Sequence, residues 1–107
     1  MRESEFQRRC LRWVADAYGG RVLAVNIHGG GATAKGFPDL LVLGKGRAAA
    51  FELKGASGYG LQPDQELWRR RFLRAGTPHH VVKDDLDEFK DIVRREFGNE
   101  AEEEVRG

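Results

Sequence analysis

The sequence contains one cysteine, and nowhere does it contain the roughly 20 consecutive apolar residues that a membrane-spanning helix needs. Cys10 cannot form a disulfide within the chain, which agrees with a reducing compartment. Residues 1–12 carry charges where the apolar part of a secretory signal would lie. These absences predict a soluble, cytoplasmic protein that has no membrane partner.

Two familiar kinds of site are missing as well. The segment Gly29–Gly36 is rich in glycine but lacks the GK[ST] ending of a nucleotide-binding P-loop, so we expect a flexible loop there. His28, His79 and His80 have no metal-ligand spacing to one another or to Cys10, and we interpret them as ordinary residues at strand ends. Cys10 lies on the apolar face of a predicted helix and is interpreted as part of the core.

The charge that is present is divided unevenly along the chain. Residues 1–74 contain 13 Lys and Arg against 7 Asp and Glu, whereas residues 75–107 contain 5 against 10. A basic part suits phosphate groups and an acidic part suits solvation. With 107 residues the chain has room for one domain, which we place at residues 1–97, and we expect the acidic residues 98–107 to be disordered.

Apolar periodicity and turn residues predict an α/β fold in the order α-β-β-β-α-β-α, with a mixed sheet flanked by helices. The predicted elements are a helix ending before Gly19, strands at Arg21–Ile27, Asp39–Leu43 and Arg47–Lys54, a helix from Pro63 to before Gly76, a strand at His79–Lys83 and a helix from Asp85 to about Phe97. Apolar helix faces that we assign to the core include Trp13 on the first helix and Leu67, Trp68, Phe72 and Leu73 on the second. Val81, Val82 and Phe97 fit either the core or an interface.

A glutamate and a lysine two residues apart, Glu52 and Lys54, end the third predicted strand. Side chains alternate across a strand, so both lie on the face opposite Phe51. A hairpin that closes at Gly44–Gly46 would place Asp39 opposite the end of this strand. Two such carboxylates suit Mg²⁺, and a nearby lysine can stabilise developing negative charge. Glycines in the surrounding loops are expected to let a phosphodiester backbone approach, so the pattern predicts a hydrolytic site for nucleic acid.

At these residues the sequence resembles a known family. Pro38-Asp39, a gap of twelve residues and Glu52-Leu53-Lys54 match the PD-(D/E)XK nuclease signature. The longer pattern GFPDLLVL…FELKG…LQPDQELW is similar to the VRR-NUC branch of that superfamily, and the resemblance covers residues 3–82. It implies a restriction-endonuclease-like fold and a nuclease that uses Mg²⁺ or Mn²⁺.

The resemblance implies a role for each matching residue of the two strands. Asp39 and Glu52 would bind the metal, the carbonyl of Leu53 would be a possible further ligand, and Lys54 would be catalytic. The alternative is that Glu52 and Lys54 form an exposed ion pair of little energetic value. Asp39 and the downstream Gln65 argue against that alternative.

Two further residues are implied by the same resemblance. Gln65 would face the site from the second helix and orient the lysine or a phosphate, although it could be only a solvated helix residue. A glutamate of the first helix completes the family's metal shell. We favour Glu3 and keep Glu5 as the alternative, and whichever is not a ligand would complement the helix dipole.

A cluster of basic residues follows on the second predicted helix. It consists of Arg69, Arg70, Arg71 and Arg74. Four arginines in six positions cannot share one helix face, so the cluster is either a solvated surface or a track for DNA phosphates. Lys35, ahead of the motif, is a further candidate for DNA binding, and Arg8, Arg9 and Arg12 would extend the track.

Together these patterns predict a metal-dependent DNA endonuclease that cleaves a phosphodiester with an activated water. By analogy with stand-alone VRR-NUC proteins of bacteriophages and bacteria, we expect a Holliday junction resolvase in a bacterial or phage-infected cell. Symmetric cleavage of two strands needs two sites, so a C₂ homodimer is expected. The alternatives are a flap or nicking nuclease of broader structure preference, and a DNA-binding module without catalysis.

Overall fold

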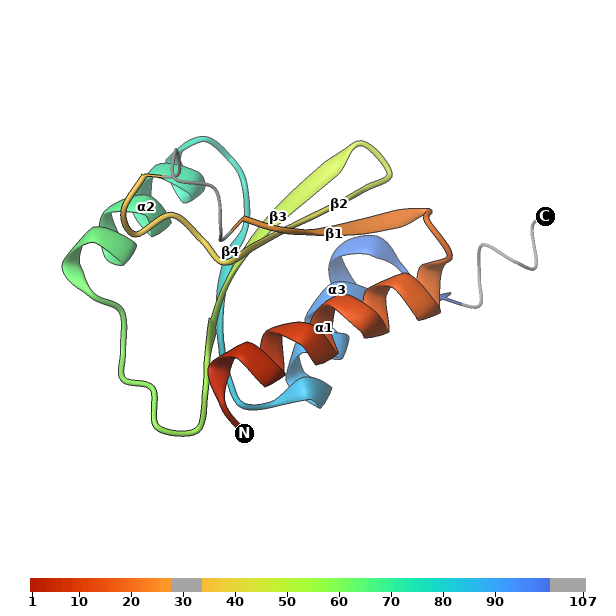
Figure 1. Ribbon diagram of the computed structural model, residues 1–107. Coiled ribbons are helices and arrows are strands. Elements are labelled where there is room, and N and C mark those ends of the chain that lie inside the picture. The colour runs from red at the N-terminus through yellow and green to blue at the C-terminus, as the bar shows by residue number, and fades with distance from the viewer. Residues whose placement is uncertain (28–33, 101–107) are drawn as a thin grey trace.

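The computed structural model describes residues 1–27 and 34–100, and its elements follow the predicted order (Figure 1). They are α1 (Glu3–Tyr18), β1 (Val22–Asn26), β2 (Leu40–Gly44), β3 (Arg47–Lys54), α2 (Pro63–Arg74), β4 (His79–Lys83) and α3 (Leu86–Phe97). The predicted α/β class and element order are confirmed. In the described part of the chain, no helix is both long and apolar enough to cross a membrane.

The four strands form one sheet in the order β1-β2-β3-β4. The pairs β1–β2 and β2–β3 are antiparallel, and β4 lies parallel to β3. Lys45 and Gly46 both have positive φ, 53° and 72°, as a two-residue hairpin turn between β2 and β3 requires. This tight turn fixes the register that pairs Leu40 with Phe51. The register is what positions the site described below.

One face of the sheet is covered by α1 and α3, which lie side by side beneath it (Figure 1). Alternate residues of β3, including Phe51 and Leu53, point into the core on this side, as predicted from the period of two. Cys10 is buried here, and burial raises the pKa of its thiol to about 12, which fits its predicted structural role. Val82 and Phe97 belong to this core, whereas Val81 faces the other side and is 38% exposed.

The prediction for the apolar face of α2 was wrong. None of its residues is buried, and Leu67 and Leu73 are 47% and 45% exposed. Trp68 and Phe72 pack against Phe37 in a small aromatic cluster, with ring centroids 4.9 and 5.5 Å from that of Phe37. This cluster lies outside the core because α2 touches the sheet mainly at the edge strand β4. The helix therefore stands beside the sheet instead of covering it (Figure 1).

The start of the expected tail is held against the domain. The hydroxyl of Tyr18 donates to the carbonyl of Gly98 over 2.7 Å, and Arg94 pairs with Glu100 over 3.0 Å. Residues 98–100 therefore differ from the expected disorder, because side chains of α1 and α3 bind them. The remaining residues of that segment, 101–107, lie outside the described residues.

Candidate active site

Asp39 and Glu52 meet where β2 begins and β3 approaches its end. One residue beyond the pair Leu40–Phe51, the antiparallel register places Asp39 opposite Glu52. An oxygen of Asp39, Oδ2, accepts a 2.7 Å hydrogen bond from the backbone N–H of Leu53. Both carboxyl side chains are almost fully buried, at 2% and 3% exposure. The predicted convergence of the two acids is present in the structure.

The environment of Glu52 disfavours its charged form. Burial, followed by the adjacent Asp39 carboxyl and the more distant charge of Glu3, raises the pKa of Glu52 to about 9, against the opposing effect of Lys54. Its Oε2 atom is buried and has no hydrogen-bond partner. Two neighbouring carboxyls with one buried oxygen that accepts no hydrogen bond form a site that a cation would complete.

The donor set fits Mg²⁺ or Mn²⁺ with an incomplete protein shell. N–H and C=O of one strand residue point to the same side, so the Leu53 carbonyl faces the Asp39 side together with its N–H. No group of three or more His, Cys, Asp or Glu in the described residues could hold a metal ion. Mg²⁺ commonly binds through one or two carboxylates and keeps waters or substrate phosphates as its other ligands. Asp39 and Glu52 satisfy that requirement.

Gln65 connects the lysine to the second carboxylate. Its Oε1 accepts a 3.0 Å hydrogen bond from Lys54 Nζ, and its Nε2 donates to Glu52 Oε1 over 3.1 Å. The same Oε1 accepts from the backbone N–H of Gln62, the residue that caps α2. Gln65 is thus no merely solvated helix residue. It fixes the lysine amine beside the acidic pair.

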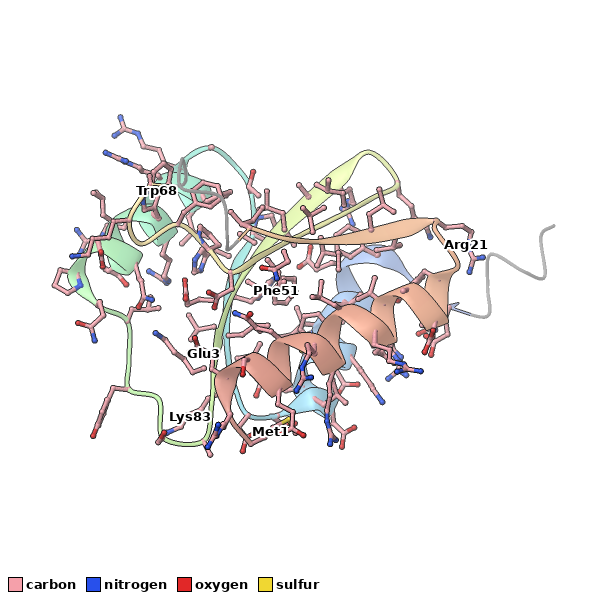
Figure 2. All side chains as sticks on the ribbon, in the orientation of Figure 1. Met1, Glu3, Arg21, Phe51, Trp68 and Lys83 are labelled. Atoms are coloured by element: carbon pink, nitrogen blue, oxygen red, sulfur yellow. The ribbon has the colours of Figure 1, made fainter. Side chains whose placement is uncertain are left out.

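The start of α1 lies against the end of β3, and a glycine permits the contact. A Cβ on Gly55 would lie 2.6 Å from the nitrogen of Glu3 and 3.0 Å from the carbonyl oxygen of Met1. Figure 2 shows Glu3 in the first turn of α1, beside this end of the sheet. Of the two candidate acids, Glu3 acts on the pKa of Glu52, whereas Glu5 pairs with Arg9 over 3.1 Å. Glu3 therefore remains the favoured candidate of the two, but the structure does not gather it with Asp39 and Glu52 into one ligand group, so its role as a ligand stays a prediction.

A second glycine brings the start of α2 to the site. Gly36 has a φ of +84°, and a Cβ there would lie 2.5 Å from the backbone carbon of Asp64 and 2.8 Å from the nitrogen of Gln65. We expected glycines near the site to admit the backbone of DNA, but Gly36 and Gly55 admit the protein's own helix starts. Sequence reasoning missed this role, although both glycines flank the two halves of the motif.

The basic residues of α2 diverge. Arg69 and Arg70 both pair with Glu66, over 3.1 and 3.4 Å, and the guanidinium of Arg71 lies 4.8 Å from the ring centre of Trp68. Arg74 is exposed in the last turn of the helix. The cluster therefore does not form one continuous row of free charges.

Lys35, another of the predicted basic residues, lies beside the first turn of α2, which carries Gln65. Its Nζ is 3.9 Å from Asp64 Oδ2, next to Gln65 in the first turn of α2, and its side chain is 93% exposed. Its carbonyl accepts a 3.2 Å hydrogen bond from the indole of Trp68. Most of the glycine-rich loop before it, and His28, lie outside the described residues.

Comparison with known proteins supports the fold. No family model matches the sequence, and no curated protein matches it. A solved structure described as a VRR_NUC domain matches 91% of this chain and 99% of its own, with a TM-score of 0.68 and 22% identity. Hjc from Archaeoglobus fulgidus, a Holliday junction resolvase from an archaeal hyperthermophile, matches 75% of this chain and 67% of its own, with a TM-score of 0.55 and 23% identity. The chain therefore has the fold of the VRR_NUC domain and of Hjc, as the sequence resemblance predicted.

Proposed function

We propose that this protein is a metal-dependent DNA endonuclease. The observation that carries the proposal is the meeting of Asp39, Glu52, Lys54 and Gln65 at one edge of a sheet that has the VRR_NUC fold. Buried carboxyls with an unsatisfied oxygen cost the fold stability, and such groups gather at functional sites.

Each residue has a role that follows from its contacts. Asp39 and Glu52 would hold Mg²⁺ or Mn²⁺, assisted by the Leu53 carbonyl and by Glu3. The bound ion would supply Lewis-acid stabilisation of the phosphoryl oxygens and lower the pKa of a coordinated water. Lys54, held by Gln65, donates hydrogen bonds to the phosphate as negative charge develops. Lys35 and the exposed arginines of α2 bind flanking phosphates.

The proposed substrate is branched DNA, most favourably a four-way junction. This choice is supported by the shared fold with Hjc, which is described as a Holliday junction resolvase. Comparison of cleavage rates on four-way, flap, nicked and linear DNA of one sequence tests it. If flap or nicked DNA is cleaved faster than the four-way junction, the proposal of a junction resolvase is rejected in favour of a nuclease of broader structure preference.

The endonuclease is tested by Asp39→Asn in Mg²⁺. We expect a loss of cleavage of about 1,000-fold or more, because the metal supplies several kcal/mol of transition-state stabilisation. Binding of the labelled junction should change little. Asp16→Asn is the matched control, since Asp16 is an exposed acid of α1 that pairs with Arg12. Cleavage by Asp39→Asn at the wild-type rate, or no cleavage by the wild-type protein in either metal, would refute the proposal.

We further propose a C₂ homodimer that uses the uncovered face of the sheet. Cross-strand neighbours share a face, so Leu23 and Leu43 lie together, as do Val25 and Leu41. Leu23 and Val25 are 53% and 39% exposed. No described helix lies over this face of β1 and β2 (Figure 1). Contiguous apolar surface of this kind favours association.

The dimer is tested by the mass of the protein in solution. We expect a dimer for the wild type and a monomer for Leu23→Arg, with Leu67→Arg on α2 as a control of similar exposure. A monomeric wild type at assay concentrations would exclude the dimer and leave the nuclease proposal standing.

A further inference from the structure

We infer that Tyr59 stacks on an unpaired DNA base beside the cleaved phosphate and so favours branch points that expose unpaired bases over fully paired DNA. This inference rests on the proposed nuclease function. Tyr59 is 84% exposed, more than any other large hydrophobic side chain in residues 1–27 and 34–100. It makes no hydrogen bond or ring contact within those residues. Nothing in the fold explains an aromatic ring at this position.

The loop that carries Tyr59, residues 55–62, joins the two elements that hold the catalytic side chains. It leaves the body between the end of β3 and the start of α2, next to the start of α1 (Figure 1). At its first end, the N–H of Ala56 donates to the carbonyl of Met1 over 2.9 Å. At its second end, the N–H of Gln62 donates to Gln65 Oε1 over 2.9 Å. Both ends of the loop are therefore anchored at the site.

Tyr59 lies next to a residue that touches the catalytic lysine. The N–H of Gly58 donates to the carbonyl of Gly55 over 3.0 Å, and this turn folds the loop back toward β3. A Cβ on Gly58 would lie 2.9 Å from the Cβ of Lys54. Consecutive Cα atoms are about 3.8 Å apart, so the Cα of Tyr59 lies within about 8 Å of the Cβ of Lys54. A ring so placed can reach a base about one or two nucleotides from the phosphate that Lys54 contacts.

The surroundings of Tyr59 favour a base as its partner. Residues 55–61 contain no charged side chain, so this loop cannot bind phosphates through ion pairs. The position of Gly60 is open, with no atom within 4 Å of a Cβ built there, which leaves room beside the ring. Stacking of a base on an exposed aromatic ring tolerates any sequence but needs a base that has left the duplex. Flaps and splayed branch points offer such bases, and a four-way junction offers them when the pairs at its branch open, whereas continuous duplex does not.

The experiment compares steady-state cleavage of two DNAs of one sequence, a fully paired nicked duplex and a splayed junction with unpaired bases at the branch. For Tyr59→Ala we expect the KM on the splayed DNA to rise about 5- to 150-fold, the range that loss of one stacked base implies. The kcat on both DNAs and the KM on the nicked duplex should stay within about twofold of the wild type. Tyr59→Phe should retain wild-type values, and Ser57→Ala is the control for a change elsewhere in the loop.

A second readout reports stacking directly. With 2-aminopurine at the branch, wild type and Tyr59→Phe should quench its fluorescence, whereas Tyr59→Ala should not. Equal KM values for Tyr59→Ala and the wild type, or an equal rise on both DNAs, would overturn the inference while leaving the nuclease intact. A change in solution mass with Tyr59→Ala, without the selective KM effect, would assign the ring to the subunit interface instead. Cleavage of a four-way junction but of neither of these DNAs would overturn this inference alone, and failure of the wild type to cleave all three would refute the nuclease and this inference together.

Discussion

The two faces of the sheet are built for different purposes. On the face that α1 and α3 cover, aromatic and aliphatic side chains form the buried core, and Phe51 packs on Phe89 with ring centres 4.9 Å apart. On the other side, α2 stands beside the sheet, and none of its own residues is buried. That face carries Glu52 and Lys54. One strand serves both purposes because its side chains alternate, so stability and chemistry occupy neighbouring positions with little overlap.

Substitutions of neighbouring residues on β3 test whether the two faces of the sheet act separately. Phe51→Ala should lower the free energy of unfolding by about 3–5 kcal/mol, the usual cost of removing a buried aromatic ring. Glu52→Gln should leave stability at pH 7 unchanged or higher, because the amide is neutral without taking up a proton, yet abolish cleavage. Urea denaturation and a cleavage assay measure the two effects. Equal loss of stability in both variants would show that the faces are not separable.

The glycines that bring helix starts to the site allow a second test. Gly36→Ala should lower the free energy of unfolding by about 1–3 kcal/mol, because φ at this position is +84° and the new Cβ would meet the backbone of Asp64. It should also slow cleavage by displacing the start of α2. Gly60→Ala is the matched control, since no atom lies within 4 Å of its added Cβ. If both variants melt at the same temperature, the close approach of α2 has no energetic weight.

A substitution of Gln65 tests which residues of α2 contribute to cleavage. Gln65→Ala should reduce kcat about 10- to 100-fold, as expected for a residue that orients reacting groups without being one, and leave the core intact. Leu67→Ala, on the same helix and 47% exposed, should leave kcat unchanged. Steady-state kinetics on a labelled junction provide the measurement. A wild-type kcat for Gln65→Ala would remove the glutamine from the mechanism.

Taken per pH unit, the dependence of stability on pH is the least of these effects. The pKa of Glu52 is raised in the folded state to about 9 from an ordinary 4.5, so the folded protein binds the extra proton between these values. Metal-free protein should therefore lose stability as pH rises from about 5 to 9, by at most about 1.4 kcal/mol per unit. Glu52→Gln should flatten this dependence, and Mg²⁺ should oppose it by replacing the proton. Thermal melts across that range measure it; a wild-type slope that Glu52→Gln leaves unchanged would assign the proton to another group.

Much of the fold and of the site could be predicted because it depends on local rules. The two-residue turn at Lys45 and Gly46 and the period of two along β3 are enough to place Asp39 opposite Glu52. The position of α2 could not be predicted in this way. Its apolar residues indicate that the helix packs on something, and only the folded chain shows that the partners are Phe37 and His79.

Other features escaped prediction because they join segments far apart in the sequence. The contact of Gly55 with Glu3 is one, and the anchoring of residues 98–100 is another. Composition alone made the acidic tail look solvated throughout, since it cannot reveal that Tyr18 and Arg94 supply partners for its first residues.

Gln65 belongs to the capping of α2 and to the acidic pair at the same time. The first turn of the helix and the alignment of the lysine therefore form one cooperative unit, and neither is complete without the other. Fraying of that turn would abolish the proposed cleavage without unfolding the core, so amide hydrogen exchange at the start of α2 would report the fraction of molecules in which the lysine is aligned.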